Sequence, residues 1–230
     1  MMAAGRWPAV DIAATGRTGP MMGATEPYPL FACKREAKPW RQSAERGRWL
    51  RAPRVGSVAP SRWRWRARAL TCFLVDIDES NLRASASAAE KFDSKAVVAV
   101  CDLSQTAQVT AAVNACRGTF GGLDILVNSA GIVHYGPADE MSAERWNAVM
   151  SVNLLAPIQL VRELLPSMTE QNESHILNVC SILGLAPGRK LMAYQTSKFA
   201  LVGLSLALRT EIGAQNVGVT AFAPVSSKRR

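Results

Sequence analysis

The most informative residues of this sequence are a tyrosine and a lysine four positions apart, Tyr194 and Lys198. On a helix this spacing places both side chains on one face, one turn apart. A phenol is a poor base at neutral pH, but an ammonium about 4 Å from the phenolate oxygen stabilises it by about 4 kcal/mol at an effective dielectric constant of about 20. This corresponds to a fall of about three pKa units from a reference value of about 10. The pair therefore predicts a proton donor and acceptor that works close to neutrality.

Because such a pair also arises by chance on exposed helices, its surroundings decide how it is interpreted. Ser181 stands 13 residues before Tyr194, at the end of a predicted strand, where its hydroxyl can point into the same crevice. Asn153 lies on the predicted helix that precedes this strand. Asn128-Ser129-Ala130-Gly131 closes a second predicted strand, and Asp102-Leu103 closes a third. Five polar segments thus meet at one edge of the expected sheet.

The elements that must position these residues alternate from Leu70 onward. Short apolar strands are followed by longer amphipathic helices, which predicts an α/β fold with a doubly wound parallel sheet. The predicted strands are Leu70–Asp76, Ala96–Cys101, Leu123–Asn128, Ser174–Cys180 and Val217–Ala223. The predicted helices are Glu79–Phe92, Gln105–Phe120, Ser142–Met168 and Ala193–Glu211. Gly121 and Gly122 are expected to end the second helix, and Ser142 to cap the third.

From about Leu70 to Pro224 the motifs, taken in order, resemble the short-chain dehydrogenase/reductase family, whose domain is Rossmann-like. The resemblance implies that Tyr194 is the general acid/base and that Lys198 lowers its pKa and hydrogen-bonds the nicotinamide ribose. It also implies that Ser181 polarises the substrate carbonyl and that Asn153 holds a proton-relay water. Hydride transfer to a carbonyl leaves an oxyanion that a hydroxyl can hydrogen-bond and a phenol can protonate, each step being worth about 10²-fold or more.

The resemblance further implies a nicotinamide cofactor, with an alcohol or ketone as substrate. Asn128, Ala130 and Gly131 would line the nicotinamide ribose, while Asp102 and Leu103 would meet the adenine. Asp76 ends the first predicted strand, where an acid accepts the ribose hydroxyls of NAD and repels the extra phosphate of NADP. NAD is therefore expected in preference to NADP. The alternative for this acid is a structural role at the start of the next helix.

The first 69 residues differ in composition from the rest of the chain. They hold 14 basic and 4 acidic side chains, against 13 and 14 in residues 70–230, so the net charge of +9 belongs to the first third. We expect residues 1–69 to be a disordered or non-homologous basic segment, such as one translated from another frame, and 70–230 a partial dehydrogenase domain. The run Arg62–Arg68 could contact nucleic acid or an anionic membrane, although a solvated arm is the favoured interpretation.

Two parts of the family pattern are missing. A glycine-rich turn should lie roughly 20 residues before the acid, but only Gly47 and Gly56 stand at about that distance, and Thr15–Gly19 is too far away. The central strand 1 is therefore expected to be absent, which would leave the inner edges of the two neighbouring strands unpaired. Apart from Ala9–Gly16, no strand is predicted before Leu70. The C-terminal strand and the substrate-covering loop are also expected to be absent.

The remaining signals concern partners and location. The five cysteines form no Cys-x-x-Cys pair, and His134 and His175 have no ligand spacing, so no metal is predicted. No apolar run approaches the roughly 20 residues of a membrane span, and a cytoplasmic location is expected. The family suggests a homo-oligomer formed through the helices Ser142–Met168 and Ala193–Glu211. The alternative function is a catalytically inactive partial domain that acts through protein interaction, or a basic arm.

Overall fold

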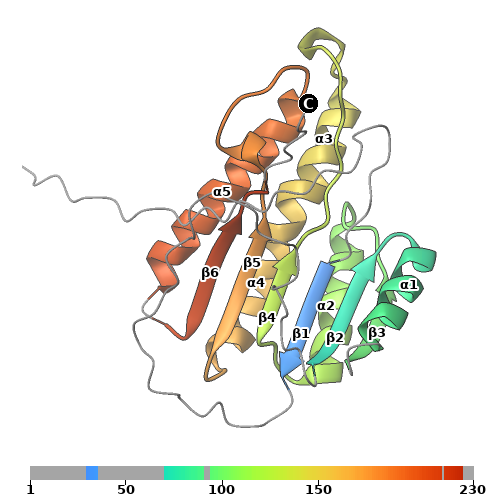
Figure 1. Cartoon of the computed structure of the whole chain (residues 1–230), viewed down its shortest axis with the longest axis vertical. Helices are drawn as coiled ribbons and strands as arrows, with labels where there is room; N and C mark the ends of the chain where they lie inside the picture. Colours follow the sequence, from blue (N-terminus) through green and yellow to red (C-terminus); the bar gives the residue numbers. More distant parts are fainter. Residues whose placement is uncertain (1–29, 36–69, 91–93, 214, 225–230) are drawn as a thin grey trace, which may run out of the picture.

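A computed structural model describes residues 30–35, 70–90, 94–213 and 215–224 of the chain (Figure 1). Its centre is a six-stranded sheet with the order β3-β2-β1-β4-β5-β6. The strands are β1 (Leu30–Arg35), β2 (Leu70–Asp76), β3 (Lys95–Val100), β4 (Ile125–Asn128), β5 (Ser174–Val179) and β6 (Val217–Phe222). The five strands predicted from Leu70 onward are thus all confirmed.

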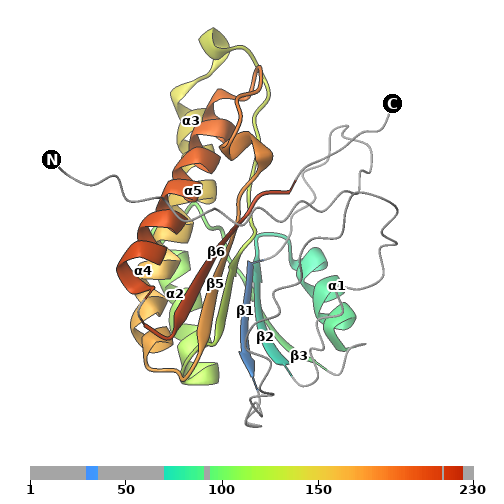
Figure 2. The ribbon, with the colours of Figure 1, turned by 60° about the vertical axis from the view of Figure 1, so that its left-hand side comes forward.

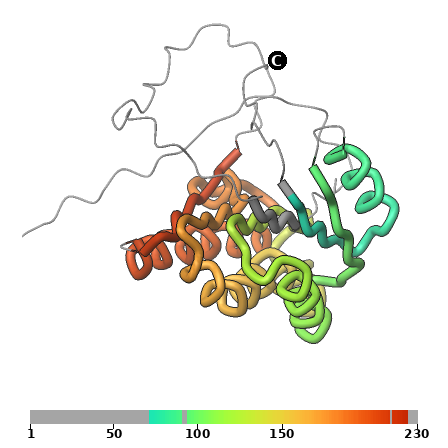
Figure 3. Tube along the Cα trace, turned by 90° about the horizontal axis from the view of Figure 1, so that it is seen from below, coloured from blue at the N-terminus to red at the C-terminus, as the bar shows by residue number. Residues whose placement is uncertain are grey.

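Helices lie on both faces of this sheet, as the doubly wound pattern predicts. They are α1 (Glu79–Glu90), α2 (Thr106–Phe120), α3 (Ala143–Met150), α4 (Ala156–Thr169) and α5 (Met192–Ile212). Short turns are η1 (Ala138–Glu140), the π-helix η2 (Ser151–Leu155) and η3 (Ile182–Gly184). Helices α2, α4 and α5 cover one face, whereas α1 lies on the other (Figures 2 and 3). The predicted end signals are confirmed, since Gly121 ends α2 at φ 66° and the Ser142 hydroxyl accepts from the Arg145 N–H.

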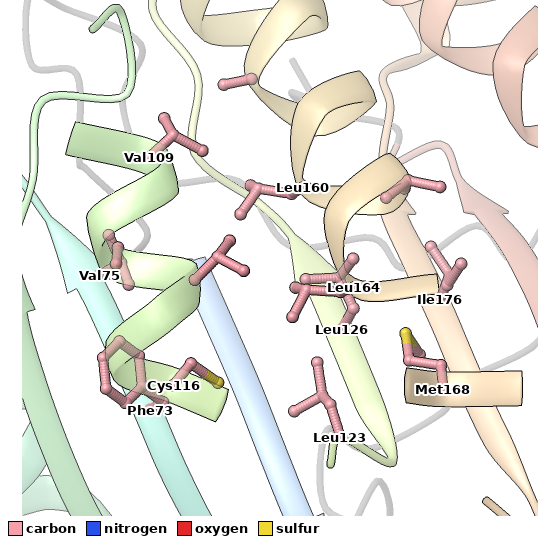
Figure 4. Packing of buried hydrophobic residues seen from close by; sticks show 14 of the residues in the cluster. Phe73, Val75, Val109, Cys116, Leu123, Leu126, Leu160, Leu164, Met168 and Ile176 are labelled. Carbon is pink, nitrogen blue, oxygen red and sulfur yellow. The ribbon is translucent and has the colours of Figure 1, made fainter. Parts of the chain in front are cut away.

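The larger core lies between the sheet and the helices α2 and α4 (Figure 4). Val109 from α2, Leu164 from α4 and Leu126 from β4 are at most 2% exposed there. Along β5 the even-numbered side chains are buried and the odd-numbered ones half-buried, which is the period of a strand. A smaller cluster of Cys72, Leu74 and Leu82 packs under α1 on the opposite face. The packed helices hold the carboxyl ends of β4 and β5 in register.

Strand β1 corrects one sequence-based expectation. The inner edges of β2 and β4 are paired, because Leu30–Arg35 lies antiparallel between them, with Cys33 opposite both Cys72 and Ile125. The expectation of no strand in this segment is therefore wrong at these six residues. The parallel strand with its glycine turn is absent from the part of the chain that the structure describes. The segments Ala9–Gly16, Thr15–Gly19 and Arg62–Arg68 lie outside it, so the expectations about them stay predictions.

The long helix predicted over Ser142–Met168 is divided by η2 into α3 and α4. The combined stretch Ala143–Thr169 is the one helical segment of the described residues that is long and apolar enough to cross a membrane. Its window is 44% buried, and Leu160, Leu164 and Met168 belong to the main core. These contacts are those of a core helix. The predicted lack of a membrane span stays a prediction.

Candidate active site

Tyr194 and Lys198 lie on the same side of α5, as their spacing predicts. The Lys198 Nζ is 5.7 Å from the centre of the Tyr194 ring. It is 4% exposed and donates a hydrogen bond of 2.8 Å to the carbonyl oxygen of Val179 at the end of β5. Ser181 follows two residues later, and its side chain hydrogen-bonds that of Tyr194. The structure thus brings the phenol, the ammonium and the serine hydroxyl together at the carboxyl end of one strand.

The expected fall in the pKa of Tyr194 is wrong for this arrangement. Burial raises the pKa of the phenol above its usual value, and the Ser181 hydrogen bond offsets this only in part. Burial also lowers the pKa of Lys198 from 10.5 to about 8. The ammonium lies over the ring and is bonded to a carbonyl, so it does little to stabilise a phenolate. Tyr194 therefore stands at neutral pH as a protonated phenol, which is the form that can donate a proton to an oxyanion.

Asn153 lies on the π-helix η2 and is fully buried. Its amide bonds both backbone groups of Ile132, with the Oδ1 accepting from the N–H at 2.8 Å and the Nδ2 donating to the carbonyl at 2.9 Å. The Nδ2 also donates to the Ser197 Oγ at 3.1 Å, and that hydroxyl donates to the Tyr194 carbonyl at 2.7 Å. Asn153 thus joins the loop after β4 to the first turns of α5. A π-helix within an α-helix often marks a functional site.

Two serines that sequence reasoning missed support this network. Ser197 has the contacts just given, and the Ser205 Oγ accepts from the Nδ2 of Asn178. The Oδ1 of Asn178 in turn accepts from the Nδ2 of Asn128 at 2.8 Å. The Oδ1 of Asn128 is the one buried side-chain polar atom without a partner among the residues that the structure describes. The only sequence signal that could have found Ser197 and Ser205 is that both lie on the same side of α5 as Lys198. Serines are too common on helices for that position to be diagnostic.

The loop after β4 approaches the lysine closely. A side chain at Gly131 would place its Cβ 3.3 Å from the Asn153 Oδ1 and 3.5 Å from the Lys198 Nζ. The backbone at this glycine therefore comes close to the ammonium. Asn128 ends β4, and Ala130 and Gly131 follow it in the loop; their contact with a nicotinamide ribose stays a prediction.

The remaining candidates lie at the ends of β2 and β3. Asp76 is 6% exposed, and its Oδ1 accepts from the Asp78 N–H at 2.9 Å. Asp102 accepts from the Ser104 N–H at 2.8 Å, and Leu103 next to it is 9% exposed. Both carboxylates thus accept hydrogen bonds within local turns. No cationic side chain among the described residues forms an ion pair with either of them. Among the residues placed by the structure, no group of three His, Cys, Asp or Glu could hold a metal ion, and the absence of a metal stays a prediction.

A nicotinamide dinucleotide fits these residues at one end only. The donors of Lys198 and Ser181 suit a nicotinamide riboside. At the pyrophosphate position, the described residues offer no glycine turn and no helix N-terminus that follows a central parallel strand. The described residues therefore offer binding groups for the nicotinamide half of the cofactor and none of the usual ones for the pyrophosphate.

Gly184 in η3 packs closely against the backbone of Lys198. A Cβ there would lie 2.7 Å from the backbone oxygen and 2.9 Å from the carbonyl carbon of Lys198. Because backbone cannot move aside cheaply, we expect Gly184→Ala to lower the free energy of unfolding by about 1–3 kcal/mol. The control is Gly118→Ala in α2, which meets nothing within 4 Å and should raise it by about 0.5–1 kcal/mol. Equal denaturant midpoints for the two variants would contradict the close packing of η3 on α5.

The comparisons with known proteins agree with this geometry. The sequence model of the short chain dehydrogenase family matches residues 65–228, so the chain belongs to that family. A D-threitol dehydrogenase of Mycolicibacterium smegmatis is 35% identical over 124 residues, which are 54% of this chain and 48% of the relative. The chain thus spans about half the length of that curated relative.

Two solved structures extend the likeness to three dimensions. A metagenomic short-chain oxidoreductase in complex with NADP matches with a TM-score of 0.64 and 33% identity, over 67% of this chain and 71% of the other. A short-chain dehydrogenase/reductase of Burkholderia phymatum in complex with NAD matches with a TM-score of 0.63 and 31% identity, over 66% and 55%. The predicted Rossmann-like α/β fold is confirmed, and the partial coverage agrees with an incomplete domain.

Proposed function

We propose that this chain is an oxidoreductase that transfers a hydride between a nicotinamide cofactor and an alcohol or ketone. The observation that carries the proposal is the joint placement of Tyr194, Ser181 and Lys198 at the end of β5. The family relation supports it, because a matched family member is named for dehydrogenation and the two solved relatives hold NADP or NAD.

In this proposal each side chain has a distinct task. The nicotinamide ring, when bound, supplies or accepts the hydride. Ser181 hydrogen-bonds the substrate oxygen, and Tyr194 gives its phenolic proton to that oxygen as negative charge develops there. Lys198 uses one of its three N–H donors on Val179, which leaves two for the ribose hydroxyls. Asn153 fixes the loop that carries Gly131, and a proton-relay water bound near it completes the path for the proton.

The cofactor is proposed to be NAD in preference to NADP. Asp76 ends β2 and Asp102 follows β3 by two residues, and an additional phosphate beside these carboxylates would be repelled. The substrate is proposed to be a small alcohol or ketone, with no metal involved. A cytoplasmic location is part of the proposal and is supported by the free thiols of Cys101, Cys116 and Cys180.

The chain is proposed to form a homo-oligomer through α4 and α5. The side of α5 opposite the catalytic pair carries Met192, Phe199 and Leu206, which are 40%, 45% and 40% exposed. A hollow of about 500 Å³ lies beside Met192 and Phe199. Leu155, where η2 joins α4, is 54% exposed. Apolar surface of this kind favours burial against a second copy.

Phe199→Asp tests this interface, because a carboxylate at its centre would have to be desolvated on association. We expect the variant to sediment as a monomer at concentrations where the unaltered chain is an oligomer. Ile77→Asp, at a residue 65% exposed outside the interface, should not change the sedimentation coefficient. An unaltered chain that is monomeric at all the concentrations measured would refute the proposed assembly.

The function itself is tested by following NADH absorbance with a panel of small ketones. We expect NADH consumption that depends on protein and ketone concentration. A chain that oligomerises but neither binds nor oxidises NADH would instead support the alternative of an inactive domain acting through protein interaction. Loss of heparin binding when the arginines of Arg62–Arg68 are replaced by serine, which leaves β1 in place, would support the basic-arm alternative.

A further inference from the structure

The reversed direction of β1 changes which backbone groups stand at the edge of the sheet where a dinucleotide would bind. β2 and β4 each run antiparallel to β1 and are parallel to their outer neighbours, so β1 is the one reversed strand of the sheet described (Figure 1). Ligands of such sheets bind at the edge formed by the carboxyl ends of the parallel strands. At that edge β1 presents its first residue, because Leu30 lies opposite Val75.

This direction removes the usual source of phosphate donors. A pyrophosphate is held by backbone N–H groups of the turn that leaves the central strand for a helix. The chain leaves β1 after Arg35, which pairs with Leu70 at the opposite edge. The residue joined to Leu30 is Pro29, which has no N–H to offer. Among the described residues, the central strand therefore does not lead into a phosphate-binding turn at the edge where Tyr194 and Lys198 stand.

The neighbouring strand ends add negative charge in place of donors. Asp76 ends β2, and Asp78 caps the first turn of α1 by accepting from the N–H groups of Ser80 and Asn81. The hydrogen bond from the Ser80 hydroxyl, together with these N–H bonds, holds the pKa of Asp78 below its usual value, so a carboxylate stands at the N-terminus of α1. Arg83 nearby is already paired with Glu79. Asp102 stands at the end of the next strand.

The nicotinamide end has the opposite character. Lys198 has two N–H donors beyond its bond to Val179, and the backbone at Gly131 comes close to its Nζ. Reduced nicotinamide riboside, which is neutral, meets donors there and has no phosphate to place among the carboxylates. The two ends of the edge thus differ in charge and in donors.

From this asymmetry we infer that the chain recognises the nicotinamide riboside end alone, and that the adenosine diphosphate half of NADH adds no net affinity. The inference rests on the proposed function, since it concerns the same site. Its consequence is that reduced nicotinamide riboside, which lacks both phosphates, is as good a ligand as NADH. The chain would then be a nicotinamide riboside-binding dehydrogenase domain.

Fluorescence titrations of the full chain with reduced nicotinamide riboside and with NADH test the inference. We expect dissociation constants within about 5-fold of each other. Raising the salt from about 0.05 M to about 0.5 M should leave riboside binding unchanged and should not weaken NADH binding, because screening relieves the repulsion of its phosphates.

Each other outcome has a distinct meaning. NADH that binds more than about 5-fold tighter than the riboside, and loses affinity with salt, would overturn the inference and leave the proposed function standing. Saturable binding of neither compound would overturn both. Asp78→Asn provides a further readout, because removing this charge should tighten NADH and leave the riboside unchanged.

Discussion

Replacing Tyr194 by phenylalanine is expected to lower the turnover number by at least about 10²-fold and to leave NADH binding almost unchanged. The substitution removes only the hydroxyl that donates the proton, while the ring remains in its half-buried place beside Lys198. The loss should therefore appear in kcat and not in the dissociation constant of the cofactor. Steady-state kinetics with a responsive ketone, together with NADH titration of the same sample, measure both.

Tyr135→Phe is the matched control for this prediction. Tyr135 is 66% exposed, and its ring lies 5.8 Å from the Lys190 Nζ, so it also pairs with a lysine. It loses the same atom at a position outside the proposed site. Equal turnover for both variants, or a Tyr194→Phe variant as active as the unaltered chain, would remove Tyr194 from the mechanism.

The second large effect concerns stability and its dependence on pH. The pKa of Lys198 is about 8 in the folded chain against 10.5 as the reference, because burial disfavours the ammonium. The unfolded chain therefore binds more protons between these values, and stability rises with pH across that window. Below pH 8 the full penalty applies, which is about 3 kcal/mol.

Lys198→Met should therefore raise the free energy of unfolding at pH 7 by about 2 kcal/mol, after about 1 kcal/mol is lost with the hydrogen bond to Val179. This advantage should shrink as the pH rises from 8 and be lost above 10.5. Urea unfolding across this range measures it, with the exposed Lys95→Met as the control whose stability difference stays small. A Lys198→Met variant that is less stable at pH 7, or a difference independent of pH, would show that the ammonium is not buried.

Much of the fold could be predicted because its strands are apolar on both faces. Leu70–Asp76 was predicted with the bounds of β2, and the glycine at 121 ended α2 as expected. The break of the long helix at η2 could not be predicted, because a single-residue change of register leaves the apolar period almost intact. Strand β1 was missed because its six residues form a strand only by pairing with β2 and β4, which are distant in sequence.

The candidate site, like the fold, could be predicted from the sequence only in part. Spacing paired Tyr194 with Lys198 and placed Ser181 at a strand end, since a helical turn and the end of a strand are local properties. The ordered resemblance to the family singled out Asn153 as well. The pKa of the tyrosine was predicted in the wrong direction, because burial, which raises it, is a property of the packed chain that the spacing of two residues does not contain. The roles of these four residues stay proposals.

The most direct test of the site is NADH titration of the unaltered chain and of Lys198→Met. Stability and binding are expected to change in opposite directions in this variant, so weaker binding could not be attributed to unfolding. The account predicts a saturable change in NADH fluorescence for the unaltered chain and a dissociation constant at least about 10-fold higher for the variant, from the loss of a charged hydrogen bond. No saturable change in the unaltered chain, or equal affinity in both, would contradict it.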